Sequence, residues 1–450
     1  MGWTWWQRAN VTGWLVRCAH GCHPPVRWPE SCCRRPTHSF ELSNIFATMN
    51  HSIIRRFSFA LLCATLSLST VAQTTAFGDN LNVVTSAMPM LAIGPDARAG
   101  GMANAGLALE PDANAIFWNP AKLAFLGEGT TQGGLSYTPW LRQLVPDVEL
   151  MFANVAVGLG ERSGIGASLR YFSLGDITFR NEQGDEQGTY RPYEMAVDVA
   201  YALKLSEHLS AGVSLRYAMS DLTQGQVVGG LQTKPGQTVS TDISLYYQGN
   251  EMNLPDGQKG QWLGGFNVSN IGAKVKYTES GREDFIPTNL RTGIGYNWTL
   301  DRYNRVTILL DVNKLLVPTK PLRDLLDEDN DGDRYEILKG MDDNVSVVQG
   351  MIQSWDPAAK PEGMNELMRE FMVNMGLEYW YDDKFAVRGG YQHEDQTKGN
   401  RRFYTMGFGL RYSLIGLDFA YLFPADQSVR SPLENTIRFS ALIDLNQLLD

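Results

Sequence analysis

The chain has 450 residues and carries 39 Lys+Arg against 49 Asp+Glu, which gives a net charge of −10. This acidic balance argues against nucleic acid as a partner and against a basic membrane-surface binder, because both need an excess of Lys and Arg. All five cysteines lie at or before Cys63, so the rest of the chain has no disulfide framework and depends on its backbone ladder and packing.

Two segments at the start of the chain are not expected in the mature protein. Residues 1–48 show no coherent hydrophobic period, and we interpret them as an upstream extension from a mis-assigned start. Residues 49–72 have the order of a secretory signal peptide, with a basic start, an apolar run and small residues before the cut: Arg55 and Arg56, Phe57–Leu68, and Thr70 and Ala72 before Gln73. Taking these 72 residues away leaves 378 residues with a net charge of −15, because the removed part holds seven Lys+Arg and two Asp+Glu.

Residues 73–130 precede a long series of strand-like segments. Their centre, Leu91–Phe125, is rich in small and turn-forming residues yet too apolar for a linker. A glycine-rich surface loop would have a similar composition. A compact segment in front of so many strands favours instead a plug inside a barrel.

Four residues of this segment are expected to shape the plug. Gly100 and Gly101 should supply flexible or left-handed backbone where a Cβ would clash. Pro120 should keep Asn119 out of the α region and start a short helical run. These residues are therefore expected to be structural.

A charged pair in the same segment is also expected to be structural. Arg98 stands two residues after Asp96 and could pair with an inward carboxylate of the barrel, such as Asp242 or Asp418. Such a pair would fix the plug to the barrel wall. We favour this anchoring role over binding of a ligand.

From residue 131 to the end, segments of about ten residues alternate between apolar and polar side chains and are separated by turn residues, which is typical of an outer-membrane barrel. Fourteen strands are predicted: Gln132–Trp140, Glu149–Leu159, Gly164–Thr178, Tyr190–Leu203, Leu209–Ala218, Val239–Tyr247, Trp262–Tyr277, Leu290–Leu300, Val306–Leu316, Met372–Tyr381, Phe385–His393, Phe403–Tyr412, Gly416–Leu422 and Thr436–Leu445. The even number suits an all-β, antiparallel transmembrane barrel, which must close because an unpaired strand edge in lipid leaves backbone groups unsatisfied. A soluble β-sandwich also has alternating strands and remains the alternative.

The faces of the strands follow from this alternation. In Phe403–Tyr412, the large apolar residues share one face, which suits lipid, and the small and polar residues share the other. The same phase in the next strand upstream turns Arg388 inward. Clusters of aromatic residues at strand ends are expected to form the two interfacial girdles: Tyr137, Trp140, Tyr246, Tyr247, Tyr379, Trp380 and Tyr381.

One long insertion, residues 317–370, separates the ninth and tenth strands. Barrels keep long loops outside the cell, so this loop is expected to be extracellular and is the best candidate for partner contact. Within it, Asp327–Asp333 matches the first half of a calcium loop, but Leu338 stands where a bidentate Glu is needed. We therefore expect a solvated acidic loop and no metal or other cofactor.

Catalysis finds little support in the sequence. Only His208 and His393 remain after residue 72, and no G-x-S-x-G nucleophile elbow is present. An enzyme would need a Ser or Asp within hydrogen-bond reach of one of these histidines. We predict that the protein is not an enzyme.

The stretch DANAIFWNPA at residues 112–121 resembles the N-terminal plug motif of FadL-type outer-membrane channels, which are fourteen-stranded barrels closed by their N-terminal segment. A closer resemblance, over residues 88–445, is to the PorV (LptO) family of the Bacteroidetes type IX secretion system. The matching stretches are IGPDARAGGM at 93–102, FNVSNIG at 266–272, GLEYWY at 376–381, RGGY at 388–391, KGNR at 398–401, GLDFAYL at 416–422 and NTIRFS at 435–440.

This resemblance implies a function that composition does not indicate. Members of the family act as outer-membrane shuttles: they take cargo from the type IX translocon, hold its C-terminal signal domain, and deliver it to the PorU sortase for surface attachment. The alternatives are a FadL-like channel for uptake of hydrophobic small molecules and, more weakly, a lipid A deacylase. The resemblance implies a location in the cell outer membrane. The motifs lie in the plug and the strands, so the cargo-contact residues stay unknown.

Overall fold

The computed structural model describes residues 82–140, 147–180, 184–228, 231–279, 281–323, 336–425 and 436–446. All of these residues belong to one compact unit, Phe77–Asp450. The expected upstream extension, the signal peptide, and the acidic stretch Asp327–Asp333 lie outside the described residues.

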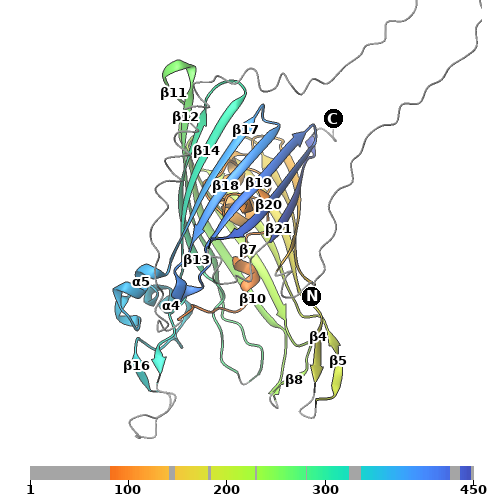
Figure 1. Cartoon of the computed structure of the whole chain (residues 1–450), viewed down its shortest axis with the longest axis vertical. Helices are drawn as coiled ribbons and strands as arrows, with labels where there is room; N and C mark the ends of the chain where they lie inside the picture. Colours follow the sequence, from red (N-terminus) through yellow and green to blue (C-terminus); the bar gives the residue numbers. More distant parts are fainter. Residues whose placement is uncertain are drawn as a thin grey trace, which may run out of the picture. The chain divides into compact units, whose positions relative to one another are not determined.

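Fourteen long strands of the described chain form one closed antiparallel barrel (Figure 1). They are β1 (Thr131–Pro139), β2 (Val148–Leu159), β3 (Ser163–Leu174), β6 (Tyr193–Lys204), β7 (Leu209–Asp221), β10 (Gly236–Gln248), β12 (Lys259–Gly272), β13 (Asn289–Thr299), β14 (Asn304–Leu315), β17 (Phe371–Tyr381), β18 (Phe385–His393), β19 (Phe403–Tyr412), β20 (Ile415–Pro424) and β21 (Ile437–Asp444). Each strand pairs with its neighbour along the chain, and β1 pairs with β21 to close the ring. The predicted fold class is therefore confirmed.

Two predicted strands are too long. The predicted strand Gly164–Thr178 ends at Leu174, and β4 (Ile177–Arg180) is a separate strand that pairs with β5 (Glu186–Tyr190) in a hairpin beyond the barrel wall. The predicted strand Trp262–Tyr277 ends at Gly272. A Cβ on Gly272 would lie 2.5 Å from the Ser240 Cβ. The period-two pattern continues through these points, so it did not reveal where the chain leaves the wall.

The two ends of the barrel differ (Figure 1). At the turn end, tight turns such as Tyr412–Ile415 join the strands, apart from a longer turn that holds β11 (Met252–Asn253) and η4 (Pro255–Gly257). At the loop end, longer connections hold the remaining elements: β4, β5, β8 (Val227–Val228), β9 (Leu231–Gln232), β15 (Leu322–Arg323), β16 (Ile337–Lys339), α4 (Val347–Gln353), η5 (Pro357–Ala359), α5 (Met364–Arg369) and η6 (Gln396–Lys398). The start of β1 and the end of β21 both lie at the turn end. That the loop end faces the exterior stays a prediction.

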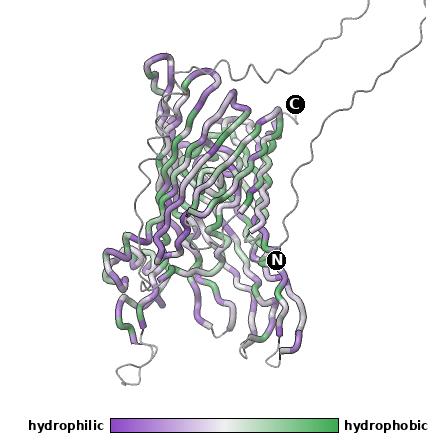
Figure 2. Tube along the Cα trace, in the orientation of Figure 1, coloured by the Kyte–Doolittle hydropathy of each residue, from purple (hydrophilic) through white to green (hydrophobic). Residues whose placement is uncertain are grey.

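Side chains alternate across the wall as predicted. In β19, Met406 and Phe408 are exposed on the outer face, whereas Thr405 is buried inside. The hydropathy colouring of the strands shows the same mixture of apolar and polar positions along each strand (Figure 2). Not every aromatic residue belongs to an outer girdle, however, because Tyr246 and Trp380 are buried in the lumen. Consecutive residues of a strand point to opposite faces, so one residue of each adjacent aromatic pair turns inward.

Residues 82–130 form a plug inside the barrel. It contains η2 (Pro89–Ala92), α2 (Ala97–Gly100), α3 (Ala115–Trp118) and η3 (Pro120–Phe125). The short helix η3 packs against β2, β3, β6, β7 and β10, while α2 packs against β19, β20 and β21 on the other side of the ring. The plug therefore spans the lumen from wall to wall.

The plug runs lengthwise through the barrel. Asn82, at its start, donates its backbone N–H to Thr397 O at 3.2 Å, in a connection at the loop end. At the other end, the plug passes into β1 at the turn end. None of the described helices is long and apolar enough to cross a membrane.

Candidate functional site

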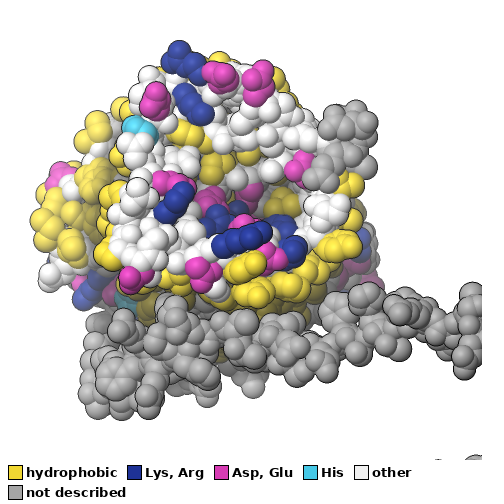
Figure 3. Space-filling model, turned by 90° about the horizontal axis from the view of Figure 1, so that it is seen from above, with side chains coloured by type: hydrophobic (Ala, Val, Ile, Leu, Met, Phe, Trp, Pro, Cys, Tyr) yellow, Lys and Arg dark blue, Asp and Glu magenta, His cyan; other side chains and the backbone are white. Residues whose placement is uncertain are grey.

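A network of buried charges joins the plug to the barrel wall. The guanidinium of Arg98 donates through Nε and Nη2 to both carboxylate oxygens of Glu378 on β17, at 3.1 and 2.9 Å. Arg388 on β18 donates to the same carboxylate at 2.6 Å and to Asp418 on β20 at 2.7 Å. Seen from the turn end, charged side chains of both signs gather in the central hollow of the barrel (Figure 3).

Arg98 does not pair with either of the carboxylates expected from the sequence. Its partners are Glu378 and, within the plug, Asp112 at 2.9 Å and Glu110 at 3.6 Å. Asp418 pairs with Arg388 and Arg411, and Asp242 pairs with Arg216. Both predicted carboxylates do face inward, but each forms its ion pairs with arginines of the barrel wall. The prediction that Arg388 points inward is confirmed, because its side chain is fully buried.

Asp96 organises the plug internally. Its carboxylate caps α2 by accepting the Ala99 N–H at 2.8 Å, and it also accepts the indole N–H of Trp118 at 2.6 Å. The N–H of Ala97 meanwhile donates to Ser440 Oγ on β21 at 2.8 Å. One carboxylate thus ties α2 to the end of α3, next to a direct bond to the wall.

The glycine pair is required for close approach, not for unusual dihedral angles. Gly101 has a φ of −68°, and neither glycine has a positive φ, so the left-handed alternative is wrong, although a Cβ on Gly100 would lie 2.7 Å from Arg438 Nη1. Ala103 and Asn104, which follow closely, are left-handed instead. A Cβ on Gly101 would lie 3.0 Å from the Cα of Gly407 on β19, so the plug and wall backbones are nearly in contact.

Asn119 and Pro120 start η3 as predicted. Asn119 is extended, with φ −161° and ψ 94°, and its side chain accepts the Ala121 N–H at 3.1 Å. Pro120 follows as the first residue of the short helix. The Asn119 Nδ2 also donates to Leu245 O on β10 at 3.0 Å, which fixes the end of the plug to the wall.

Five buried charged residues, which we call the anchor cluster, fix the long loop to the barrel: Lys314, Lys360, Lys398, Glu366 and Glu370. The Nζ atoms of Lys314 and Lys360 lie 2.7 and 2.8 Å from Glu370 Oε2, and Lys398 Nζ lies 2.6 Å from Glu366 Oε1. Every side chain in the cluster is at most 4% exposed. The cluster therefore binds α5 to β14 and to the β18–β19 connection.

Within the anchor cluster, the neighbouring ammonium groups favour the ionised carboxylate of Glu370. Burial lowers the pKa of the Lys360 ammonium, and Lys398 adds to this shift, although Glu370 opposes it. Burial acts to raise the pKa of Glu370, but Lys314 and Lys360 outweigh it and hold that pKa below its ordinary value of 4.5. Three ammonium groups share two carboxylates, so the cluster depends on both glutamates staying ionised.

The long loop also exposes five apolar side chains, which we call the loop patch: Val348, Ile352, Trp355, Met364 and Met368. In α4, Val348 and Ile352 are four residues apart and lie on one face, with 67% and 68% of their surface exposed. In α5, Met364 and Met368 have the same spacing and are 57% and 62% exposed. Exposed apolar faces of this kind mark sites of protein or membrane contact.

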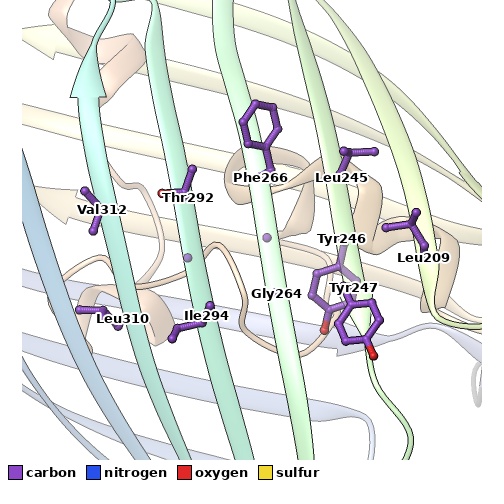
Figure 4. Close-up of a pocket in the computed structure, with 12 residues that line it drawn as sticks. Leu209, Leu245, Tyr246, Tyr247, Gly264, Phe266, Thr292, Ile294, Leu310 and Val312 are labelled. Carbon is purple, nitrogen blue, oxygen red and sulfur yellow. The ribbon is translucent and has the colours of Figure 1, made fainter.

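A recess of about 520 Å³ lies on the outer face of the barrel (Figure 4). Gly264 on β12 pairs with Tyr247 on β10 and with Ile294 on β13, and its missing side chain leaves the gap. Phe266 and Leu245 border the recess. Because this face meets lipid tails in a membrane barrel, the recess can hold an acyl chain.

The two histidines that were weighed as catalytic bases contact other groups. Among the described hydrogen bonds, the ring of His208 contacts Gln248 O at 3.1 Å and the ring of His393 contacts the Tyr391 hydroxyl at 3.3 Å. No group of three or more His, Cys, Asp or Glu residues in the described chain is arranged to hold a metal ion. The question of calcium at Asp327–Asp333 falls outside the described residues.

Comparison with known proteins gives one family match. A family model described as "Type IX secretion system protein PorV" matches residues 76–322. A search of curated proteins found no match.

Several solved barrels are similar in structure. The toluene transporter TbuX of Ralstonia pickettii is 14% identical with a TM-score of 0.40, and 81% of this chain and 98% of that chain are covered. The toluene transporter TodX of Pseudomonas putida is 11% identical with a TM-score of 0.43 and the same coverage. A FadL homologue of Pseudomonas aeruginosa is 10% identical with a TM-score of 0.39, covering 80% of this chain and 99% of that chain.

Replacing Glu378 should destabilise the barrel. Glu378→Gln leaves Arg98 and Arg388 buried with one charge partner fewer, so we expect the free energy of unfolding to fall by about 3 kcal/mol or more. Urea titration of the barrel in lipid vesicles measures this change. Glu186→Gln is the control, because its pair with Arg180 is more than half exposed and should be worth less than about 1 kcal/mol. Equal losses in both variants would contradict the assigned role.

Adjacent glycines on β18 should respond differently to valine. A Cβ on Gly390 would lie 2.4 Å from the carbonyl carbon of Met102, whereas nothing lies closer than 3.9 Å to one on Gly389. We expect Gly390→Val to loosen the plug, increasing its cleavage by added protease and the conductance of the barrel in planar bilayers. Gly389→Val should behave like the wild type. If both variants stay closed, the plug does not need this close approach.

Acid should release the long loop. Because the folded-state pKa of Glu370 lies below the unfolded value of 4.5, its carboxylate stabilises the folded loop above about pH 4.5, and this contribution is lost as the pH falls through the folded pKa. Protease cleavage of the loop, followed against pH, should rise below pH 4.5. Glu370→Gln should show the same cleavage already at pH 7. A loop that stays protected in that variant would argue against the anchor cluster.

Proposed function

The chain belongs to the PorV family of type IX secretion system proteins, and from this premise we propose that it is an outer-membrane shuttle for exported proteins. It binds the C-terminal signal domain of cargo that leaves the translocon and delivers that domain to the PorU sortase complex. The loop end of the barrel faces the exterior, in keeping with the rule that outer-membrane barrels place their long loops outside. The family match ends at residue 322, so the role of the loop beyond it rests on its geometry alone.

The observation that carries the proposal is the loop patch. Five large apolar side chains from α4, α5 and the residues between them are exposed at the loop end. Monomeric proteins rarely expose a contiguous apolar surface unless it binds a partner. Aromatic residues and methionine are enriched at protein interfaces, and this patch contains both Trp355 and the two methionines of α5.

The anchor cluster fixes this surface in position on the barrel. Glu370 follows α5 directly and binds Lys314 on the barrel wall, while Lys360 lies between η5 and α5. A pre-organised surface loses less conformational entropy on binding than a free loop does. The loop is therefore suited to hold a folded domain at the rim.

The uptake channel remains the second candidate. It would need a path past the plug, where Arg98 is bound on both sides of its guanidinium by Glu378 and Asp112 and where Gly101 touches the wall backbone. Opening such a path would leave buried charges without partners, at a cost of several kcal/mol. A plug that is fixed in this way supports docking at the rim over transport through the lumen.

Polar replacements in the loop patch should weaken cargo binding. Ile352→Ser combined with Met368→Ser removes two exposed apolar side chains, and truncation of interface anchors typically costs about 2 kcal/mol each. We expect the amount of cargo signal domain recovered with the protein from outer membranes to fall about tenfold or more. Ile177→Ser, an exposed isoleucine in the β4–β5 hairpin at the same end, is the control.

Deletion of residues 317–370 extends the same test. Cargo should then be lost altogether while the barrel still folds, as shown by its circular dichroism. Normal recovery of cargo after either change would rule out the loop as the contact site. Copurified hydrophobic small molecules in place of cargo would favour the uptake channel.

A further inference from the structure

A second site lies at the turn end, away from the loop patch. A cavity of about 450 Å³ opens there between the plug, the inner wall and the rim of the barrel. We call it the vestibule, and its charged lining consists of three arginines and four acids: Arg98, Arg305, Arg411, Glu110, Asp112, Asp383 and Asp444. Figure 3 shows the charged hollow at this end of the molecule.

The deeper carboxylates of the vestibule already have partners. Glu110 accepts hydrogen bonds from Asn297 at 2.7 Å and from Arg305 at 2.5 Å. Asp112 accepts from Arg98 and from the backbone N–H of Asn114, both at 2.9 Å. The hydrogen-bonding capacity of these two acids is therefore largely used within the protein.

Two donors in the same wall have no partner within the part of the chain that the structure describes. Trp380 is 4% exposed and lines the vestibule, yet its indole N–H finds no acceptor among the described residues, and the same holds for Nε of Arg305. The two residues are direct cross-strand partners on β17 and β14, so their side chains leave the wall on the same face. Arg411, which is paired with Asp418, lies 5.3 Å from the centre of the Trp380 ring. This corner therefore lacks an oxygen acceptor for its two N–H donors.

The mouth of the vestibule has the opposite need. The side chain of Asp383 is 79% exposed and, among the described ion pairs, is bound by Arg305 alone at 3.0 Å. Asp444 lines the cavity on the last strand. A purely anionic ligand would meet these carboxylates, so the fitting ligand carries a cationic group as well as an anionic one.

The rim of the vestibule is apolar and reaches the lipid-facing surface. Ile415 and Ile443, which are paired across β20 and β21, line the cavity and are exposed on the outer face of the barrel. A ligand with acyl chains can therefore place its headgroup in the vestibule and its chains along these two isoleucines. The volume is within the usual range for small-molecule sites.

From these observations we propose that the vestibule binds the headgroup of a zwitterionic phospholipid of the phosphoethanolamine class. The phosphate accepts from Trp380 and Arg305, and the ammonium group meets Asp383 and Asp444. The lipid then bridges the plug, through the vestibule lining, and the membrane at the turn end. This site is separate from the loop patch and does not depend on the cargo role.

The test uses the full chain in maltoside micelles and isothermal titration calorimetry with phosphatidylethanolamine. Trp380→Phe keeps an aromatic ring for packing but removes the indole N–H, and we expect it to bind the lipid about tenfold or more weakly. The matched control is Trp298→Phe, because Trp298 is also at the turn end but donates to Gln258 at 2.9 Å. Equal affinities for the wild type and Trp380→Phe would overturn the proposal.

Competition on the wild-type protein keeps the proposal testable even where a variant does not fold. Soluble glycerophosphoethanolamine should displace the lipid, which supports recognition of the headgroup. Displacement by inorganic phosphate at the same concentration would overturn the proposal, because it would show that the ammonium group is not recognised. Equal binding of phosphatidylglycerol, which is anionic, would overturn it for the same reason.

Discussion

The fold depends on the pairing of charges that are buried between the plug and the wall. Arg98, Glu378 and Arg388 lie in a lumen that is shielded from water, where each charge alone would cost several kcal/mol. Together their opposite charges compensate one another, so the plug and the barrel stabilise each other. The close contact of Gly101 with Gly407 brings the backbones near enough for these side chains to meet. The plug is thus the core of the protein and not an accessory to the barrel.

Much of this architecture could be predicted from the sequence, because a barrel wall has a strict period of two. The strand Phe385–His393 was predicted with the observed bounds, and the inward direction of Arg388 follows from the same pattern. The partner of Arg98 could not be derived in this way, because periodicity tells which face a residue occupies but not which residue lies across the lumen. A signal for Glu378 was nevertheless present, since it is in phase with the inward Asn374 of its strand. The vestibule combines turns, plug and rim that are far apart in the chain, so no local pattern reveals it.

The two candidate sites use different physical properties of the same barrel. The loop patch offers exposed apolar area on short helices whose base is held by buried ion pairs. The vestibule offers donors and carboxylates in a small concave space. Membership of the PorV family places the chain among type IX secretion system proteins, but the match ends at residue 322, so the roles proposed for both sites rest on their geometry and chemistry.

The lengthwise course of the plug constrains the order of assembly. Its start is bonded beside η6 at the loop end, its end enters β1 at the turn end, and the seam of the cylinder lies between β1 and β21. If the seam closed first, Glu378 and Arg388 would face an empty lumen without Arg98, and the rest of the plug would have to be threaded through. Strands that wrap around a plug already in place avoid both problems, so joining the first strand to the last is the natural final step of biogenesis.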